Sequence, residues 1–286
     1  MVAATSDNLA REPRHGITTR EGVRLFYRDD FLGEPWLRDS AEVVVLLHGI
    51  AESGSVWYAW IAALALRRRV ISIDFAGHGR SAIAADVPYD WSPERLASDI
   101  RQLVDALGVR RFHLVGAKYG ASIAVLYAAS HPGQVISLSA VSGPVQVAGS
   151  AGAATVRESL QRVRTAGLRT WVEESMDSRL GSEVSAGQRA WWIDLMASTD
   201  ERAVQACLDV FASLDLRHCL PSIVAPTLFV TANRNALMAM EGFKTWAAAV
   251  ARARLVVLDA DCYHPAAVKP QECIAAVLTH MDASSC

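Results

Sequence analysis

The sequence has little net charge and contains no long apolar segment. At pH 7 the formal net charge is −2 over 286 residues, so no excess of basic residues indicates nucleic acid or an anionic membrane as a partner. No apolar run approaches the roughly 18 residues that a membrane-spanning helix needs. The polar residues 1–14 lack the apolar stretch of a signal peptide. We therefore expect a cytoplasmic protein in which residues 1–14 form a loose arm.

Cysteine is also scarce, and its placement excludes the common cysteine-based sites. The five cysteines are odd in number and scattered, with neither a C-x-x-C pair nor the spacing of a zinc site. Reduced thiols are therefore the expectation, with no metal and no organic cofactor. The cysteines are Cys207, Cys219, Cys262, Cys273 and Cys286.

Lysine is rarer still. The chain has three lysines, Lys118, Lys244 and Lys269, and its other Lys/Arg positions are all arginine. A lysine amine can lose its proton in a protein, whereas an arginine guanidinium cannot. A lysine in a sharp turn is therefore a candidate for chemistry in this chain. Lys118 occupies such a turn, Gly116-Ala117-Lys118-Tyr119-Gly120, which an apolar run precedes and a helical pattern follows.

The composition that remains is that of a globular α/β protein. Hydrophobic residues make up 51% of the chain and charged residues 20%, and 286 residues suffice for one core domain with an insertion. Short apolar runs alternate with amphipathic stretches, which predicts βαβ units and a mostly parallel sheet. We expect strands at 23–28, 42–47, 70–73, 111–115, 135–140, 226–230 and 255–258, and helices at 56–66, 92–107, 121–130, 242–251 and 270–281.

The alternation breaks in residues 144–216, which contain helical patterns and no convincing strand. These patterns fall at 153–164, 168–176, 188–196 and 202–212. An insertion of this kind between two strands predicts a helical cap over the carboxyl edge of the sheet. The expected organisation is a core of residues 1–143 and 217–286 with a cap of residues 144–216.

Four segments together resemble the α/β-hydrolase superfamily over roughly residues 22–281. They are the His-Gly turn that ends 44–49, the D-x-x-G-H-G-x-S turn at 74–81, the glycine-bounded turn at 116–120 and the Ala-Pro-Thr-Leu segment at 225–228. The cap and residues 216–226 look most similar to enol-lactone hydrolases and small carboxylesterases. The resemblance implies a mostly parallel sheet flanked by helices, and it makes 116–120 the nucleophile elbow.

All three positions of the family's catalytic triad are altered. Lys118 stands where the resemblance places the nucleophilic serine, and Asn235 stands where it places the acid. Counting back from Pro270 puts Tyr263 in the position of the histidine, with His264 one residue late. Either Tyr263 or His264 could face the site. A Ser-His-Asp esterase cycle needs a hydroxyl, an imidazole and a carboxylate, so this chain cannot run it with the usual parts.

Two features of the family that need only backbone atoms, the elbow turn and the oxyanion hole, are compatible with this sequence. Gly116 and Gly120 still permit the strained turn. The resemblance implies an oxyanion hole built from the backbone N–H groups of Ile50 and Tyr119, which needs no particular side chain. Further candidates for substrate binding are Glu52 and Ser53 after the His-Gly turn, and Trp191 and Trp192 in the cap.

A lysine at the elbow would have a lowered pKa, because a helix N-terminus and a dry pocket both disfavour the ammonium form. A neutral amine could form a Schiff base with a carbonyl compound, or act as general acid or base. Tyr263 or His264 would be its partner, and Asn235 would orient that partner. We expect an enzyme, monomeric or homodimeric, that cleaves or rearranges a β-dicarbonyl, oxo acid or lactone. The alternatives are hydrolysis by activated water and a non-catalytic ligand-binding protein.

Overall fold

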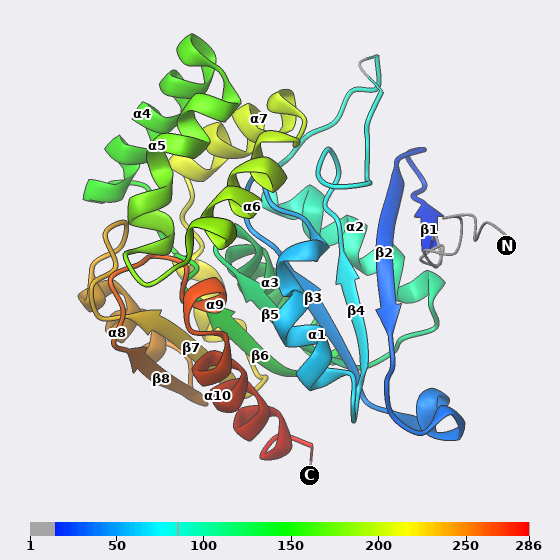
Figure 1. Cartoon of the computed structure of the whole chain (residues 1–286). Coiled ribbons are helices and arrows are strands. Elements are labelled where there is room, and N and C mark those ends of the chain that lie inside the picture. Colours follow the sequence, from blue (N-terminus) through cyan, green and yellow to red (C-terminus); the bar gives the residue numbers. More distant parts are fainter. Residues whose placement is uncertain (1–14, 85, 286) are drawn as a thin grey trace, which may run out of the picture.

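An eight-stranded, mostly parallel sheet forms the centre of the molecule (Figure 1). The computed structural model describes residues 15–84 and 86–285. The strand order is β1-β2-β4-β3-β5-β6-β7-β8, with antiparallel pairing only at β1–β2 and β2–β4. This is the α/β fold that the sequence predicts. The strands are β1 (His15–Thr18), β2 (Arg24–Asp30), β3 (Val43–Leu47), β4 (Arg69–Ile73), β5 (Phe112–Ala117), β6 (Val135–Val141), β7 (Thr227–Ala232) and β8 (Ala253–Leu258).

The central strands are apolar because both faces of the sheet are covered. Every residue of β3 and of β5 is buried, whereas β8 at the edge alternates between half-buried and exposed positions. The parallel register pairs Leu47 of β3 with Gly116 of β5. This register brings the loop after β3 beside the turn after β5, so both loops reach the same point at the carboxyl edge.

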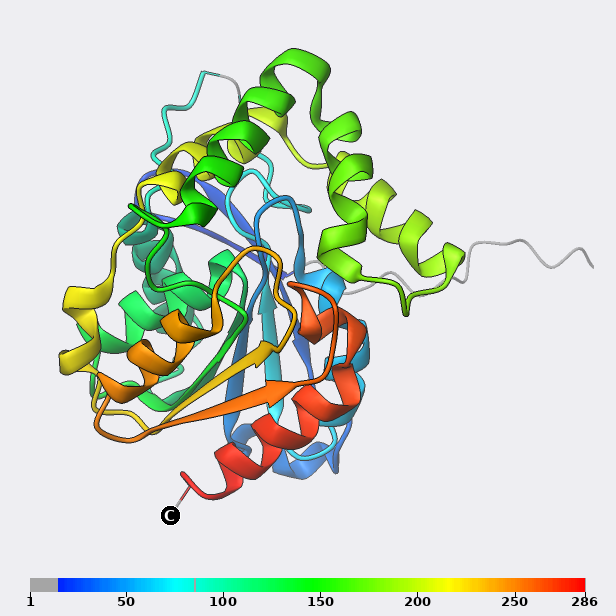
Figure 2. The ribbon, with the colours of Figure 1, turned by 90° about the vertical axis from the view of Figure 1, so that its left-hand side faces the viewer.

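Helices cover both faces of the sheet (Figure 2). Helices α1 and α10 pack together on one face, while α2, α3 and α8 lie on the other (Figures 1 and 2). The α-helices of the core are α1 (Tyr58–Leu64), α2 (Pro93–Ala106), α3 (Tyr119–Ser130), α8 (Met240–Ala248), α9 (Pro265–Val268) and α10 (Pro270–Asp282). The 3-10 helices are η1 (Pro35–Ser40), η2 (Gly54–Trp57) and η3 (Arg217–Ser222).

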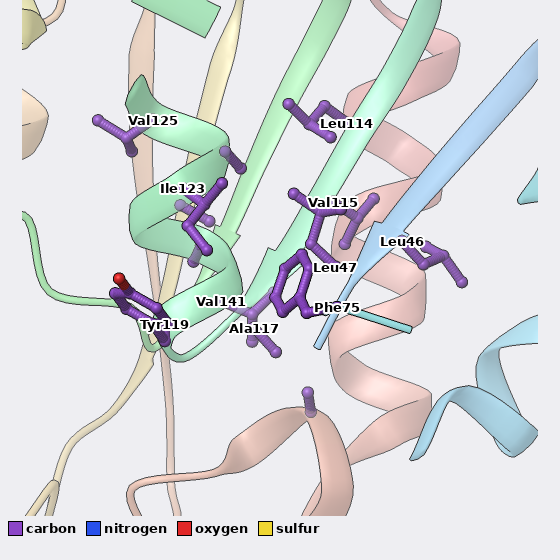
Figure 3. Close-up of a cluster of buried hydrophobic side chains, with 14 of the residues drawn as sticks. Leu46, Leu47, Phe75, Leu114, Val115, Ala117, Tyr119, Ile123, Val125 and Val141 are labelled. Carbon is purple, nitrogen blue, oxygen red and sulfur yellow. The ribbon is translucent and has the colours of Figure 1, made fainter. Parts of the chain in front are cut away.

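Helix α3 is enclosed on all sides. Each residue from Tyr119 to Ala128 is buried, so the helix has no polar face. Figure 3 shows Tyr119, Ile123 and Val125 of this helix within the cluster of buried hydrophobic side chains. This tight packing fixes the start of α3, and therefore the turn that precedes it, against the sheet.

Four further helices lie over the carboxyl ends of the strands (Figure 1). We call them the cap helices: α4 (Ala151–Ala166), α5 (Leu168–Leu180), α6 (Ala186–Ala197) and α7 (Glu201–Ala212). They follow β6 and precede β7, within the segment 144–216 that the sequence marks as a helical insertion. Among the described residues, no helix combines the length and apolarity needed to cross a bilayer.

Several details differ from the sequence-based expectations. Strand β1 was not expected, and it pairs only with β2 at the edge of the sheet. The stretch expected as one helix at 56–66 is divided into η2 and a shorter α1 that ends at Leu64. Strand β8 begins at Ala253, two residues before the expected start, because its register with β7 starts at Thr227. The arm expected at residues 1–14 lies outside the described residues.

Candidate active site

The turn between β5 and α3 has the strained geometry of an elbow. Lys118 has φ 58° and ψ −125°, a backbone conformation that residues other than glycine rarely adopt. A Cβ atom at Gly116 would lie 2.4 Å from the Gly120 carbonyl oxygen, and one at Gly120 would lie 2.4 Å from the His48 carbonyl oxygen. Only glycine fits at either position. The Lys118 N–H donates to the Val141 carbonyl oxygen at 3.0 Å, which ties the turn to β6.

Two backbone N–H groups beside Lys118 are available to an anionic oxygen. Within residues 15–84 and 86–285, neither the Ile50 N–H nor the Tyr119 N–H donates a backbone hydrogen bond. Both residues line the same cavity as Lys118. The oxyanion hole stays a prediction, and these two donors meet its first requirement of being unoccupied.

The Lys118 amine is enclosed by Tyr263. The lysine is 8% exposed, and its Nζ lies 3.2 Å from the centroid of the Tyr263 ring. Nζ also donates a hydrogen bond of 3.4 Å to the Tyr263 carbonyl oxygen. Of the two residues that the sequence left open, Tyr263 is therefore the one that contacts the amine and lines the cavity.

His264 points instead toward a buried carboxylate. Its Nε2 lies 3.1 Å from Oε1 of Glu52, which is an ion-pair distance. The contact does not have the geometry of a hydrogen bond. The ring also packs edge-on against Trp192, with 5.0 Å between ring centroids. The other Glu52 oxygen accepts from the Gly49 N–H at 2.9 Å. Arg179 of helix α5 is also near, with its Nη1 3.7 Å from Glu52 Oε1.

Burial and the neighbouring charges shift the pKa values of this cluster. Burial lowers the pKa of Lys118 well below its ordinary value, and the Arg179 charge lowers it further, although Glu52 raises it. Burial raises the pKa of Glu52, but His264, Arg179 and the Gly49 N–H together lower it to about 2. Burial lowers the pKa of His264 despite the nearby carboxylate. The cluster thus contains a carboxylate and a guanidinium, Glu52 and Arg179, beside an amine whose neutral form is favoured by burial.

A cavity of about 430 Å³ lies above Lys118, between the sheet and the cap helices. Its volume is in the range of small-molecule sites. The Tyr263 phenol is held in this wall: burial raises its pKa, while Arg179 and hydrogen bonds with Ser178 and Ser175 act in the opposite direction. The lining residues are Ile50, Lys118, Tyr119, Thr155, Val156, Glu158, Ser159, Arg162, Trp171, Glu174, Ser175, Ser178, Arg179, Leu208, Phe211, Leu237 and Tyr263.

Asn235 does not orient Tyr263 or His264, which corrects the expectation from the sequence. Its Nδ2 donates to Ser142 Oγ at 3.0 Å and to Thr231 Oγ1 at 3.3 Å. Its Oδ1 accepts from the N–H groups of residues 237 and 238. The side-chain amide therefore holds the loop after β7, and it has no free donor or acceptor with which to orient Tyr263 or His264.

The remaining substrate-binding candidates lie outside the cavity wall. Trp192 is fully buried against His264, and Trp191 packs on Tyr58 and Trp192 with 38% of its surface exposed. The Ser53 hydroxyl oxygen accepts from the Ser55 N–H at 3.3 Å and caps η2. Glu52 is 1% exposed and lies behind the lysine, so it acts on Lys118 through its charge and not as a cavity residue.

The sequence reasoning missed Arg179, the cation that the cap brings to the site. A single arginine in an amphipathic helix carries no signal, because the same pattern describes a solvated helix face. Its contact with Glu52 joins residues that are far apart in the chain, and only the fold reveals it. Among the described residues, no group of three or more histidine, cysteine, aspartate or glutamate side chains could hold a metal ion.

The sheet, the elbow and the cap-covered cavity define an enzyme of the α/β-hydrolase superfamily. The family described as alpha/beta hydrolase fold matches residues 42–269, and the chain belongs to this family. A pimeloyl-(acyl-carrier protein) methyl ester esterase of Aeromonas hydrophila is 28% identical over 241 residues, which cover 81% of this chain and 92% of the relative.

Solved structures agree with this assignment. A hydrolase from Pseudomonas aeruginosa superposes with a TM-score of 0.82 at 25% identity, over 95% of this chain and 99% of that one. The enol-lactonase from Burkholderia xenovorans superposes with a TM-score of 0.82 at 22% identity, over 94% and 100% of the two chains. The second likeness supports the fold alone.

Proposed function

We propose that this enzyme acts on a small carbonyl compound (a β-dicarbonyl, oxo acid or lactone) with Lys118 as an amine nucleophile. The observation that carries the proposal is the position of Lys118. It stands at the elbow, beside two unoccupied N–H donors, in a cluster whose charges are already balanced by Glu52 and Arg179. A second cation there would have no partner, so the amine holds a lone pair at neutral pH.

The first steps of a Schiff-base reaction fit this arrangement. The Nζ lone pair forms a bond to the carbonyl carbon, and the C=O π electrons move to the oxygen, which the Ile50 and Tyr119 N–H groups would stabilise. A proton then passes from nitrogen to that oxygen to give a carbinolamine. Uptake of one further proton and loss of water produce a protonated imine on Lys118.

The protonated imine supplies the electron sink for the rest of the reaction. Electrons of the carbon–carbon bond one position away flow into the C=N⁺ group and an enamine forms; the departing carbon leaves as CO₂ from a 3-oxo acid, or as an acyl group that is transferred to an attacking water molecule from a β-dicarbonyl. Protonation of the enamine carbon and hydrolysis of the resulting imine then release the product and restore the free amine. The Tyr263 ring covers the amine and limits its contact with water, and burial is the main cause that lowers the pKa of Lys118.

Trapping with borohydride tests the proposal directly. The protein would be incubated with candidate ketones and oxo acids, reduced, digested and analysed by mass spectrometry. We expect an adduct on the peptide that contains Lys118 and none in the Lys118→Arg variant, because a guanidinium stays protonated and offers no neutral amine. Lys244, which is exposed on α8, provides a matched control: Lys244→Arg should leave the adduct unchanged. A substrate that turns over without an adduct would overturn the covalent role.

Hydrolysis by activated water is a second candidate, favoured by the esterase and hydrolase relatives. Here the neutral Lys118 amine would take a proton from water as the water attacks a lactone or ester carbonyl held by the same N–H groups. This route predicts incorporation of ¹⁸O from labelled water into the acid product, with no borohydride adduct. A ligand bound without any turnover would contradict both routes and indicate a non-catalytic binding protein.

A further inference from the structure

Arg179 is a buried cation whose hydrogen-bond donors take no part in the chemistry proposed above. Its side chain lines the cavity and is 4% exposed. Its Nε has no hydrogen-bond partner among the described residues, and Glu52, its ion-pair partner, is 3.7 Å from Nη1. A guanidinium carries five N–H donors, and buried donors are normally satisfied. An unpaired Nε–H at the wall of a substrate-sized cavity, on a guanidinium whose carboxylate partner Glu52 is 3.7 Å away, therefore points to a second, anionic partner.

Two aromatic rings hold the guanidinium in place without using its donors. The Arg179 Cζ lies 5.6 Å from the Trp171 ring centroid and 5.2 Å from the Tyr263 ring centroid. Contacts with ring faces restrict the side chain while its N–H groups stay available. Arg179 is thus positioned in advance, as a residue that recognises a carboxylate should be.

We propose that the substrate carries a carboxylate, which Arg179 binds while the substrate carbonyl lies against the Lys118 amine. The substrate is then an oxo acid and not a neutral ketone or lactone. The carbonyl half of this inference rests on the function proposed above, whereas the carboxylate half stands on Arg179 by itself.

The Lys118 amine and the Arg179 guanidinium both lie beside the Tyr263 ring and line one cavity. The Lys118 Nζ is 3.2 Å, and the Arg179 Cζ 5.2 Å, from the same ring centroid. Both groups line one cavity, so a chain of a few carbon atoms can reach from one to the other. The apolar side chains of Leu208, Phe211 and Leu237 line the same cavity and would receive the remainder of the molecule.

The positive charge of the imine intermediate is offset within the cluster only if the substrate carries a carboxylate. Before substrate binds, Glu52 and Arg179 offset each other. The protonated imine adds one positive charge to this buried cluster, and a substrate carboxylate supplies the negative charge that offsets it. A neutral ketone would leave the imine cation without a partner.

Two carboxylates in the cavity wall do not oppose an anionic ligand. Glu158 is exposed. Glu174 is about half exposed and accepts a hydrogen bond of 2.8 Å from Arg162, which neutralises it. Both lie where solvent screens their charge, whereas Arg179 is buried.

Calorimetric binding of matched acids and amides tests the inference. The probes are 2-oxopentanoate, 4-oxopentanoate and 5-oxohexanoate, each compared with its primary amide, which has the same shape without the charge. With the full-length protein, we expect at least one acid to bind about 10-fold to 100-fold more tightly than its amide, as a charge-assisted pair with arginine provides. Failure of every acid to bind more tightly than its amide would overturn the inference.

Variants assign the preference to Arg179. Arg179→Met should reduce the preference for the acid to about 3-fold or less, and Arg179→Lys should retain only part of it. Because Arg179→Met leaves Glu52 unpaired, the double variant Glu52→Gln/Arg179→Met, which removes both charges, should show the same loss in a folded protein. Arg169→Met is the control, since Arg169 lies on the same helix but is exposed and does not line the cavity; its preference should equal that of the wild type.

The results separate this inference from the proposed function. A preference for acids that depends on Arg179, without a borohydride adduct on Lys118, would support the carboxylate site and reject the Schiff base. Adducts that form equally with acids and amides would support the Schiff base and reject the carboxylate site. A preference that survives in Arg179→Met would reject Arg179 as the binding residue.

Discussion

The turn after β5 and the loop after β8 both reach the lysine, but they depart from the family pattern in different ways. In the turn after β5, the backbone has the conformation of a nucleophile elbow, and only the central side chain differs, because Lys118 stands where the family has serine. In the loop after β8, the arrangement is displaced by one residue, so Tyr263 covers the amine and His264 turns to Glu52.

The difference shows which functions the backbone can preserve. The elbow and its N–H donors depend on glycines that leave no room for a Cβ atom, so they survive exchange of the side chain at the centre. A catalytic base depends on the direction of one side chain, and a shift of a single residue is enough to remove it. The following predictions test this contrast, from the largest expected effect to the smallest.

The largest effect is expected for Gly116→Ala. The new methyl group would meet the Gly120 carbonyl at 2.4 Å, so the elbow must open, and we expect a loss of about 3 kcal/mol in the free energy of unfolding. Gly133→Ala is the matched control, because no atom lies within 4 Å of the position that its new methyl group would take. Urea unfolding measures both; equal stability of the two variants would contradict a sterically enforced elbow.

Glu52→Gln should also cost about 3 kcal/mol, because it leaves the Arg179 charge buried without its anion. The pKa of Glu52 is lowered from 4.5 to about 2, so its contribution is complete above pH 4.5 and is lost as the pH falls toward 2. The difference between wild type and variant should shrink over this range. Glu241→Gln, at an exposed ion pair with Lys244, should change stability little at any pH.

Lys118→Met should stabilise the protein at pH 7 by about 1 to 2 kcal/mol, because it replaces a buried amine by an apolar chain of similar length. The pKa of Lys118 is lowered in the folded state, so the unfolded chain binds more protons and the wild type gains stability as the pH rises toward about 10.4. The advantage of the variant should therefore decrease between pH 7 and pH 10 in urea unfolding. A constant advantage would mean that Lys118 is protonated in the folded protein.

The smallest effect is expected for Tyr263→Phe. The ring that covers the Lys118 amine remains, and only the phenol oxygen near Ser175 and Ser178 is lost, so we expect a change of about 0.5 kcal/mol in stability. Borohydride trapping on Lys118 should remain within a few-fold of the wild type. A loss of trapping of 100-fold or more would instead make the phenol a proton donor in the reaction.

The sequence predicts the fold well, because the fold depends on local patterns. The buried runs of β3 and β5, the helical segment between β6 and β7 and the glycines of the elbow are all visible as periodicity or spacing. The segment boundaries were less accurate where tertiary pairing decides them, as at β1 and β8.

The candidate site could be predicted only in part. The position of Lys118 follows from its flanking glycines, but the direction of a side chain in a loop does not follow from its place in the sequence. Tyr263 and His264 are adjacent in the chain, yet one contacts the amine and the other a carboxylate. Asn235 fits the acid position by spacing, yet its loop uses all its hydrogen-bonding groups.

The contact between Arg179 and Glu52 has a consequence for how the protein can be divided. The cation belongs to the cap and the anion to the core, and the Tyr263 N–H also donates to the Ser178 carbonyl oxygen of α5. A core expressed without the cap would expose the apolar wall of the cavity and leave Glu52 without its guanidinium. We therefore expect the insertion to fold together with the core and not to be exchangeable between relatives as a module.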